Sequence, residues 1–171
     1  MPLLITGATG HLGRLVVEQL LAAGVPAGDI IATGRATDKI KDLADRGVQV
    51  RAVDFADPAA VRAAVADADR VLLVSAMDPG GRVAQHRNVI DAARDAGTGL
   101  VAYTSIVNAA TTTIRLAADH QATEQARDTF LSAGTHFKVR YWHGGKYGGS
   151  AGGAARRIRR VRAGLPDPGA A

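Results

Sequence analysis

The sequence predicts an α/β fold in which a doubly wound parallel sheet is flanked by helices, and three observations support it. Short apolar stretches alternate with amphipathic ones along residues 1–140, as expected of strands and helices that follow each other in turn. The apolar run 71–74 is typical of a central parallel strand that is buried on both faces. Gly7, Gly10 and Gly13 join the first strand directly to the first helix.

The predicted elements follow one another with short connections. Strands are expected at residues 3–6, 30–33, 48–53, 71–74, 100–104 and 137–140. Helices are expected at residues 11–23, near 38–45, and at 57–66, 81–96 and 116–132. Asp57 and Pro58 favour a helix start, because an aspartate accepts bonds from unpaired N–H groups and a proline fits the first helical turn.

Length and composition bound the class of protein. At 171 residues, the chain is long enough for one domain with a sizeable core. It contains no cysteine, which excludes disulfides and thiolate metal sites, and no metal site is expected. We find neither a charged-then-apolar leader nor an apolar run of about 20 residues, so no signal peptide and no membrane span are expected. The expectation is a soluble cytoplasmic protein.

The net charge of +5 comes from the end of the chain. Residues 1–134 carry 13 basic and 15 acidic side chains, whereas residues 135–171 carry 8 basic and 1 acidic. The segment 141–171 is rich in Gly, Ala and Arg and has little apolar surface to bury, so we expect it to be poorly ordered. The expected organisation is a folded domain at 1–140 and a basic, non-regular tail at 141–171.

The turn between the first strand and the first helix predicts a dinucleotide site. Gly7 allows a sharp turn, Gly10 leaves room for a pyrophosphate, and Gly13 lets the helix pack closely on the strand. The ligand would face unpaired N–H groups at the positive end of the helix dipole. Three further residues direct backbone N–H groups toward it: Thr9, His11 and Leu12. The alternative is an ordinary tight turn, but strand, turn and helix come in the required order.

The end of the second strand indicates which dinucleotide fits. An acidic residue about 20 residues past the glycines selects NAD through the ribose hydroxyl, whereas a basic residue accommodates the 2′-phosphate of NADP. Here Gly34 and Arg35 follow the strand without a carboxylate, and Lys39 adds a positive charge nearby. Arg35 can bind a phosphate through two parallel hydrogen bonds, and the alternative is a solvated loop residue. NADPH is therefore the expected cofactor of a Rossmann-like domain, with NADH as the alternative.

Several motifs in register extend this prediction to a family. They are Gly7-x-x-Gly10-x-x-Gly13, QHRNVIDAA at 85–93, AYTS at 102–105, and LAADH at 116–120 followed by Thr123 and Glu124. In these motifs the chain resembles the NmrA-like, atypical branch of the short-chain dehydrogenase/reductase superfamily. It is most similar to the type 2 NAD(P)H:quinone oxidoreductases, over about residues 1–140.

The resemblance stops near residue 140. Family members continue into a smaller substrate-binding lobe, introduced by an Arg-Asn-Gly-Trp-Tyr-like segment that residues 140–144 (RYWHG) only partly match. We therefore expect a truncated or frameshifted product, with a naturally short variant as the alternative. A nucleic-acid-binding arm is a third, disfavoured interpretation, because residues 156–162 contain five arginines but no aromatic or groove-fitting motif.

The resemblance also implies further cofactor contacts. The superfamily places adenine contacts at the end of the third strand, where Asp54 would accept the adenine amino group and Phe55 would flank the ring. Capping of the local backbone by Asp54 is an equal alternative. Ser75 follows the fourth strand, over the path expected for the nicotinamide ribose.

The catalytic machinery departs from the superfamily. In place of the usual Tyr-x-x-x-Lys pair, the chain has His120 and Glu124, one helical turn apart. The glutamate would hold the imidazole in one tautomer or raise its pKa, which makes His120 a candidate proton donor. The alternative is a pair on a solvated helix face. Tyr103 and Ser105 end the fifth strand beside the expected nicotinamide ring and are further candidates. The resemblance implies that Ser105 corresponds to the superfamily's active-site serine, and the alternative is that it only satisfies the local backbone.

The resemblance implies an NADPH-dependent oxidoreductase that transfers hydride to a small molecule, a quinone-like acceptor. Quinone reduction tolerates the missing tyrosine, because its protons can come from water while the protein aligns two flat rings. The alternative is an NmrA-like redox sensor that binds NAD(P) and a protein partner without efficient catalysis. Neither a nucleic-acid partner nor a membrane is expected, and the sequence leaves the oligomeric state open.

Overall fold

The computed structural model describes residues 1–78, 80–130 and 138–141, and the strands in these ranges form one sheet. In spatial order they are β3 (Gln49–Ala52), β2 (Ile30–Gly34), β1 (Leu3–Ile5), β4 (Arg70–Leu73), β5 (Leu100–Ile106) and β6 (Lys138–Tyr141). Every neighbouring pair is parallel. This strand order is that of a Rossmann-type doubly wound sheet, so the predicted fold class is confirmed.

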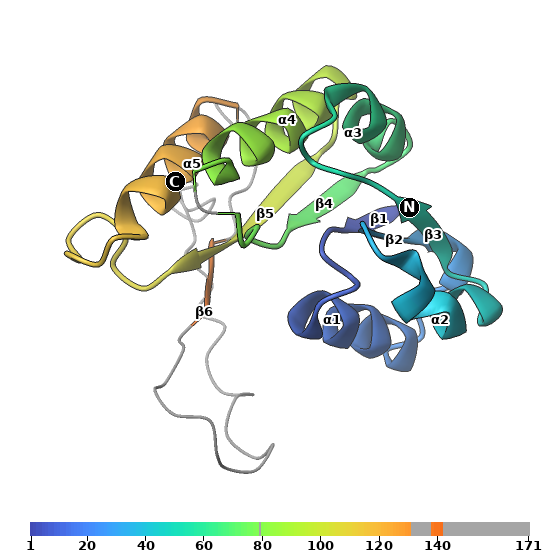
Figure 1. Cartoon of the computed structure of the whole chain (residues 1–171). Coiled ribbons are helices and arrows are strands. Elements are labelled where there is room, and N and C mark those ends of the chain that lie inside the picture. The colour runs from blue at the N-terminus through green and yellow to red at the C-terminus, as the bar shows by residue number, and fades with distance from the viewer. Residues whose placement is uncertain (79, 131–137, 142–171) are drawn as a thin grey trace, which may run out of the picture.

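Helices cover both faces of the sheet (Figure 1). α1 (His11–Ala22) and α2 (Lys41–Asp45) lie on one face, and α3 (Pro58–Val65), α4 (Arg82–Asp95) and α5 (Ala117–Phe130) lie on the other. Two short 3₁₀ helices, η1 (Ala27–Asp29) and η2 (Thr37–Ile40), precede β2 and α2. Among the helices of the described ranges, none combines the length and apolar character that spanning a bilayer requires.

Each helical layer packs on the sheet through its own apolar cluster. On one face, Val17 of α1 and Leu43 of α2 are fully buried. On the other face, Val61 of α3 and Val89 of α4 pack in one cluster with Tyr103 of β5. Burial of each such side chain contributes roughly 1.5–3 kcal/mol to stability. The sheet is thus held firmly between two layers, which gives the loops at its edge a rigid support.

The predicted elements are all found, with boundaries that shift by a few residues. The fourth strand ends one residue early, because the Val74 N–H donates to the Thr6 hydroxyl instead of to a neighbouring strand. The fifth strand is longer than predicted, because it pairs with β6 as far as Ile106. The polar helix predicted near 38–45 is divided into η2 and α2.

The expected tail lies almost wholly outside the described residues. β6 includes Tyr141, the first residue assigned to the tail by its composition. The predicted poor order of residues 142–171, and the arginine cluster at 156–162 within them, fall outside the described ranges. The division of the chain near residue 140 therefore stays a prediction.

Candidate functional site

The predicted cofactor residues gather at one edge of the sheet, because the strands are parallel and their carboxyl ends face the same way. The winding direction reverses between β1 and β4, and ligands of open α/β sheets bind outside the strand ends at such a reversal. Gly7, Arg35, Asp54 and Ser75 follow four different strands there, and Ser105 lies near the end of a fifth.

The glycine turn has the close packing that its sequence predicts. Gly7 adopts a φ of +62°, which residues with a side chain rarely tolerate. A Cβ atom on Gly13 would lie 2.4 Å from the Gly7 carbonyl oxygen, so α1 packs this closely only with glycine there. Gly34 plays a similar part that the sequence did not reveal. A Cβ atom on Gly34 would lie 2.5 Å from the methyl carbon of Thr9.

The start of α1 is suited to an anion. Its N-cap residue, Gly10, makes no side-chain capping bond, and the first turn contains no acidic side chain. Gly10 and His11 are exposed, while Thr9 and Leu12 are half-buried. Helix N-termini attract anions through their unpaired N–H groups and the helix dipole. The turn therefore fits a pyrophosphate in shape and in charge, without a carboxylate to repel it.

Beyond β2 and β3 the surface is open. Arg35, Asp54 and Asp57 line a depression of about 420 Å³. Arg35 is exposed, and within the described part of the chain its side chain makes no hydrogen bond or ion pair. The Asp54 carboxylate accepts the Ala56 N–H at 2.9 Å, so the capping role considered for it is present. Contact of Asp54 with an adenine stays a prediction.

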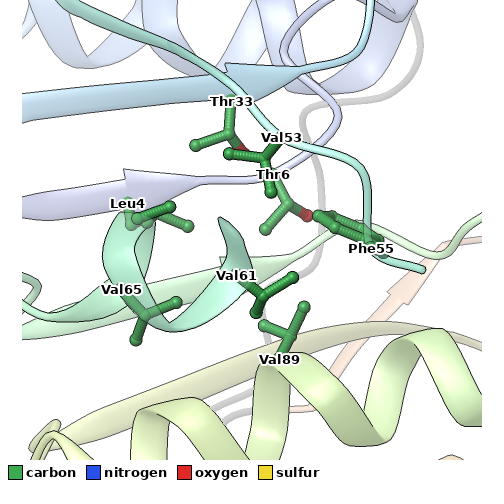
Figure 2. Close-up of a pocket in the computed structure, with 9 residues that line it drawn as sticks. Leu4, Thr6, Thr33, Val53, Phe55, Val61, Val65 and Val89 are labelled. Atoms are coloured by element: carbon green, nitrogen blue, oxygen red, sulfur yellow. The ribbon is translucent and has the colours of Figure 1, made fainter. Parts of the chain in front are cut away.

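Phe55 has a more enclosed environment. Its half-buried ring packs against the core and borders a gap of about 10 Å³ together with Thr6, Thr33 and Val89 (Figure 2). A gap of this size holds at most one water molecule, so it is not the nucleotide site. The Phe55 carbonyl accepts the Asn88 side-chain amide at 2.8 Å, which ties this loop to α4. A contact between Phe55 and an adenine ring stays a prediction.

On the other side of the winding reversal, side chains hold the loop after β4. Three consecutive backbone N–H groups donate to side chains from three different parts of the fold. The bonds are Val74 to Thr6 Oγ1 at 2.8 Å, Ser75 to Thr104 Oγ1 at 2.9 Å, and Ala76 to His86 Nε2 at 2.9 Å. The half-buried Ser75 is thereby fixed at the sheet edge.

A buried polar network continues from this loop into α5. The Ala76 carbonyl accepts Arg82 Nε at 2.6 Å, and Arg82 also pairs with Asp119 at 2.8 Å. His86 Nδ1 lies 2.9 Å from Thr123 Oγ1. Because Nε2 of the neutral His86 ring accepts the Ala76 N–H, its hydrogen is on Nδ1 and is donated to Thr123.

The four candidate catalytic residues form pairs that differ from the predicted one. The Tyr103 hydroxyl lies 2.7 Å from His120 Nδ1, and Ser105 Oγ donates to Glu124 at 2.5 Å. His120 is 4% exposed, so its placement on a solvated helix face is wrong. Tyr103 is fully buried, and its hydroxyl is engaged by His120. Tyr103 therefore supports His120 and does not itself present a proton donor at the surface.

Burial keeps the histidines of this network neutral. Burial and then the Arg82 guanidinium lower the pKa of His86 to about 3. The same two causes lower the pKa of His120, against an opposing attraction from Glu124. The expected rise in the pKa of His120 is therefore wrong, because desolvation outweighs the carboxylate. Burial also raises the pKa of Tyr103.

The sequence does not show how the residues of this network bond to one another, although four of them lie in the motifs that carry the family resemblance. The residues that organise the network are Thr6, Arg82, His86, Thr104, Asp119 and Thr123. Besides those motifs, the local signal is a spacing of four between pairs on one helix, whereas the bonds to the loop after β4 join residues 6 to 68 positions apart. Among the described side chains, no group of three or more His, Asp or Glu residues is placed to hold a metal ion.

A parallel sheet whose winding reverses beside a glycine turn and an uncapped helix defines a dinucleotide-binding protein of Rossmann type. The chain belongs to the NAD(P)H-binding family, which residues 7–132 match. It is 45% identical over 121 residues to quinone oxidoreductase 2 of Escherichia coli, a match covering 71% of this chain and 42% of that protein. The predicted resemblance to type 2 NAD(P)H:quinone oxidoreductases is thereby confirmed.

Solved structures give the same relationship. The fold matches the NADPH complex of an NADPH-dependent quinone oxidoreductase from Escherichia coli with a TM-score of 0.75 and 40% identity, over 81% of this chain and 48% of that one. It matches the NADP(H) complex of the Citrobacter sp. triphenylmethane reductase with the same TM-score of 0.75, identity of 40% and coverage of 81% and 48%. The chain thus spans about half the length of these relatives.

Proposed function

We propose that this chain binds NADPH and is the dinucleotide-binding part of an oxidoreductase that transfers hydride to a quinone-like acceptor. The observation that carries the proposal is an uncapped helix start beside an exposed Arg35, at the place where NAD-selective proteins have an acid. The similarity to quinone oxidoreductase 2 supports a quinone as the acceptor. NADH is the weaker alternative, because it lacks the phosphate that Arg35 would bind.

The proposed roles follow the order of the strands. Backbone N–H groups at the start of α1, in the turn that Gly7 and Gly13 shape, would bind the pyrophosphate. Arg35 would bind the 2′-phosphate, and the depression that it shares with Asp54 would take the adenosine. Ser75 and its loop would lie along the nicotinamide half. When bound, the reduced nicotinamide supplies the hydride.

The acceptor also needs a proton, since a quinone becomes a hydroquinone by gaining one hydride and one proton. Neutral His120 and buried Tyr103 are poor acids at neutral pH, because burial lowers the pKa of the first and raises that of the second. We propose that water supplies the proton and that Ser105, held by Glu124, orients the acceptor. Tyr103 then acts as a positioning residue for His120.

A second candidate function is a redox sensor, which the sequence at 120–124 favours, because it lacks the Tyr-x-x-x-Lys pair. The two functions differ in turnover. We expect the purified full chain to oxidise NADPH only when a quinone such as menadione is present, measured by the loss of NADPH absorbance. Binding of NADPH and NADP⁺ with similar affinity and no oxidation would favour the sensor. No binding of either would overturn both proposals.

A further inference from the structure

Both backbone polar groups of Ala76 are held by side chains of one helix. His86 Nε2 accepts its N–H at 2.9 Å, and Arg82 Nε donates to its carbonyl at 2.6 Å. Arg82 and His86 are four residues apart, so they lie on the same face of α4. Arg82 is 6% exposed and His86 is fully buried. Water therefore has little access to replace either bond.

Arg82 and His86, which together form a clamp on Ala76, are themselves bonded to α5. Asp119 accepts Arg82 at 2.8 Å, and Thr123 accepts His86 Nδ1 at 2.9 Å. The Thr123 hydroxyl in turn donates to the Asp119 carbonyl at 2.8 Å. The loop after β4 is thus joined through two side chains to α5, the helix that carries His120 and Glu124.

The position of Ala76 follows from the geometry of a bound dinucleotide. The turn after β1 fits the pyrophosphate, and the depression at Arg35 and Asp54 lies on the β2 and β3 side. The two halves of a dinucleotide extend in opposite directions from the pyrophosphate. The half that bears the nicotinamide must therefore extend over β4 and β5, where residues 74–76 form the first loop.

We propose that Arg82 and His86 are positioning residues, which fix Ala76 and its loop against the nicotinamide half of the bound cofactor. This inference rests on the proposed function. Neither side chain needs to touch the cofactor, since both act through the Ala76 backbone. The clamp holds the reacting half in place, whereas Arg35 and the glycine turn hold the other half. Fixed placement matters most at the reacting half, because hydride transfer depends steeply on distance and alignment.

The two nitrogen atoms of His86 allow a matched pair of variants. The amide of asparagine reaches the position of Nδ1, so His86→Asn keeps a partner for Thr123 and leaves the Ala76 N–H without one. The longer His86→Gln reaches the position of Nε2 and keeps the Ala76 bond. The ligands to compare are NADPH and 2′,5′-ADP, which lacks the nicotinamide half. Dissociation constants are measured by calorimetry on the full chain.

We expect His86→Asn to weaken NADPH binding by about tenfold, which corresponds to about 1.4 kcal/mol, and to leave 2′,5′-ADP binding unchanged. His86→Gln keeps the Ala76 bond but loses the bond to Thr123, so it should weaken NADPH binding by no more than about threefold and leave 2′,5′-ADP binding unchanged. Equal weakening of NADPH by the two variants, or equal weakening of both ligands by His86→Asn, would overturn the clamp. An unsubstituted chain that binds neither ligand would overturn the proposed function itself.

A second pair keeps the test decisive where His86→Asn does not fold. Thr123→Val removes the acceptor of His86 Nδ1–H, whereas Thr123→Ser retains it. We expect the valine variant, but not the serine variant, to weaken NADPH binding about threefold with 2′,5′-ADP binding unchanged. Identical behaviour of these two variants toward NADPH would overturn the role of the clamp.

Discussion

The sheet has two halves, β1 to β3 and β4 to β6 (Figure 1), and the loops at the carboxyl ends of their strands are held by different means. Around β1, β2 and β3, the site depends on backbone geometry, with glycines that allow close packing and an exposed Arg35. Around β4 and β5, it depends on buried side chains, such as Arg82 and His86, that bond across the fold. Within the described residues, Arg35 of the first half makes no bond, whereas Arg82 and His86 of the second half use their donors internally.

This difference matches what each half of a dinucleotide requires. Phosphates are bound by charge and by N–H groups, which must stay unpaired until the ligand arrives. A reacting ring requires a surface that does not move, which a satisfied polar network provides. We therefore expect substitutions in the first half to change packing or affinity locally, and substitutions in the second half to loosen the loop after β4.

The largest expected effect is on the glycine turn. Gly13→Ala places a Cβ atom 2.4 Å from the Gly7 carbonyl oxygen, so the backbone of the turn or of α1 must move to relieve the clash. We expect the free energy of unfolding to fall by roughly 3 kcal/mol or more, measured by urea denaturation. Gly28→Ala is the control, because a Cβ atom there meets nothing within 4 Å. Similar stability of the two variants would show that the turn is not tightly packed.

A smaller effect is expected for the exposed cation of the first half. Arg35→Ala should weaken NADPH binding roughly thirtyfold, or about 2 kcal/mol, because a charge-assisted contact to phosphate is lost. NADH binding and the free energy of unfolding should stay unchanged, since Arg35 is exposed and makes no bond to the described residues. Arg62→Ala, at an exposed arginine of α3, is the control. Equal weakening of NADPH and NADH would contradict a role in phosphate selection.

The connection between the two halves is tested at Thr6. Its hydroxyl accepts the Val74 N–H at 2.8 Å and so joins the end of β1 to the loop after β4. Thr6→Val keeps the shape but leaves that N–H unpaired, which should cost roughly 1–2 kcal/mol in the free energy of unfolding. Thr113→Val, at an exposed threonine, should change it by less than about 0.5 kcal/mol. Urea denaturation of Thr6→Val and Thr113→Val measures this difference. Equal stability of the two variants would show that the bond between Thr6 and Val74 contributes nothing.

The same contrast explains what the sequence could predict. The close packing of the turn at Gly7 and Gly13 was predictable because it depends on local spacing along the chain, and the role of Arg35 stays a prediction. The Thr6 to Val74 bond was not predictable, since it joins residues 68 positions apart and needs the finished fold. Glu124 was expected either to fix the tautomer of His120 or to raise its pKa. It does favour a higher pKa, but burial, which spacing does not show, lowers the pKa overall.

The effect that is smallest at neutral pH, and grows only as the pH is lowered, is the pH dependence of the buried network. Because burial lowers the pKa of His86 from 6.5 to about 3, only the unfolded chain takes up a proton there between these values. Stability should therefore fall as the pH is lowered through this window, by at most about 1.4 kcal/mol per pH unit from this residue. Urea denaturation at several pH values should show a shallower fall for His86→Gln than for the unsubstituted chain. His11→Gln, at an exposed histidine, should keep the original slope. If His86→Gln kept it too, His86 would not be a buried neutral acceptor for Ala76, and the second half would lose the feature that sets it apart from the first.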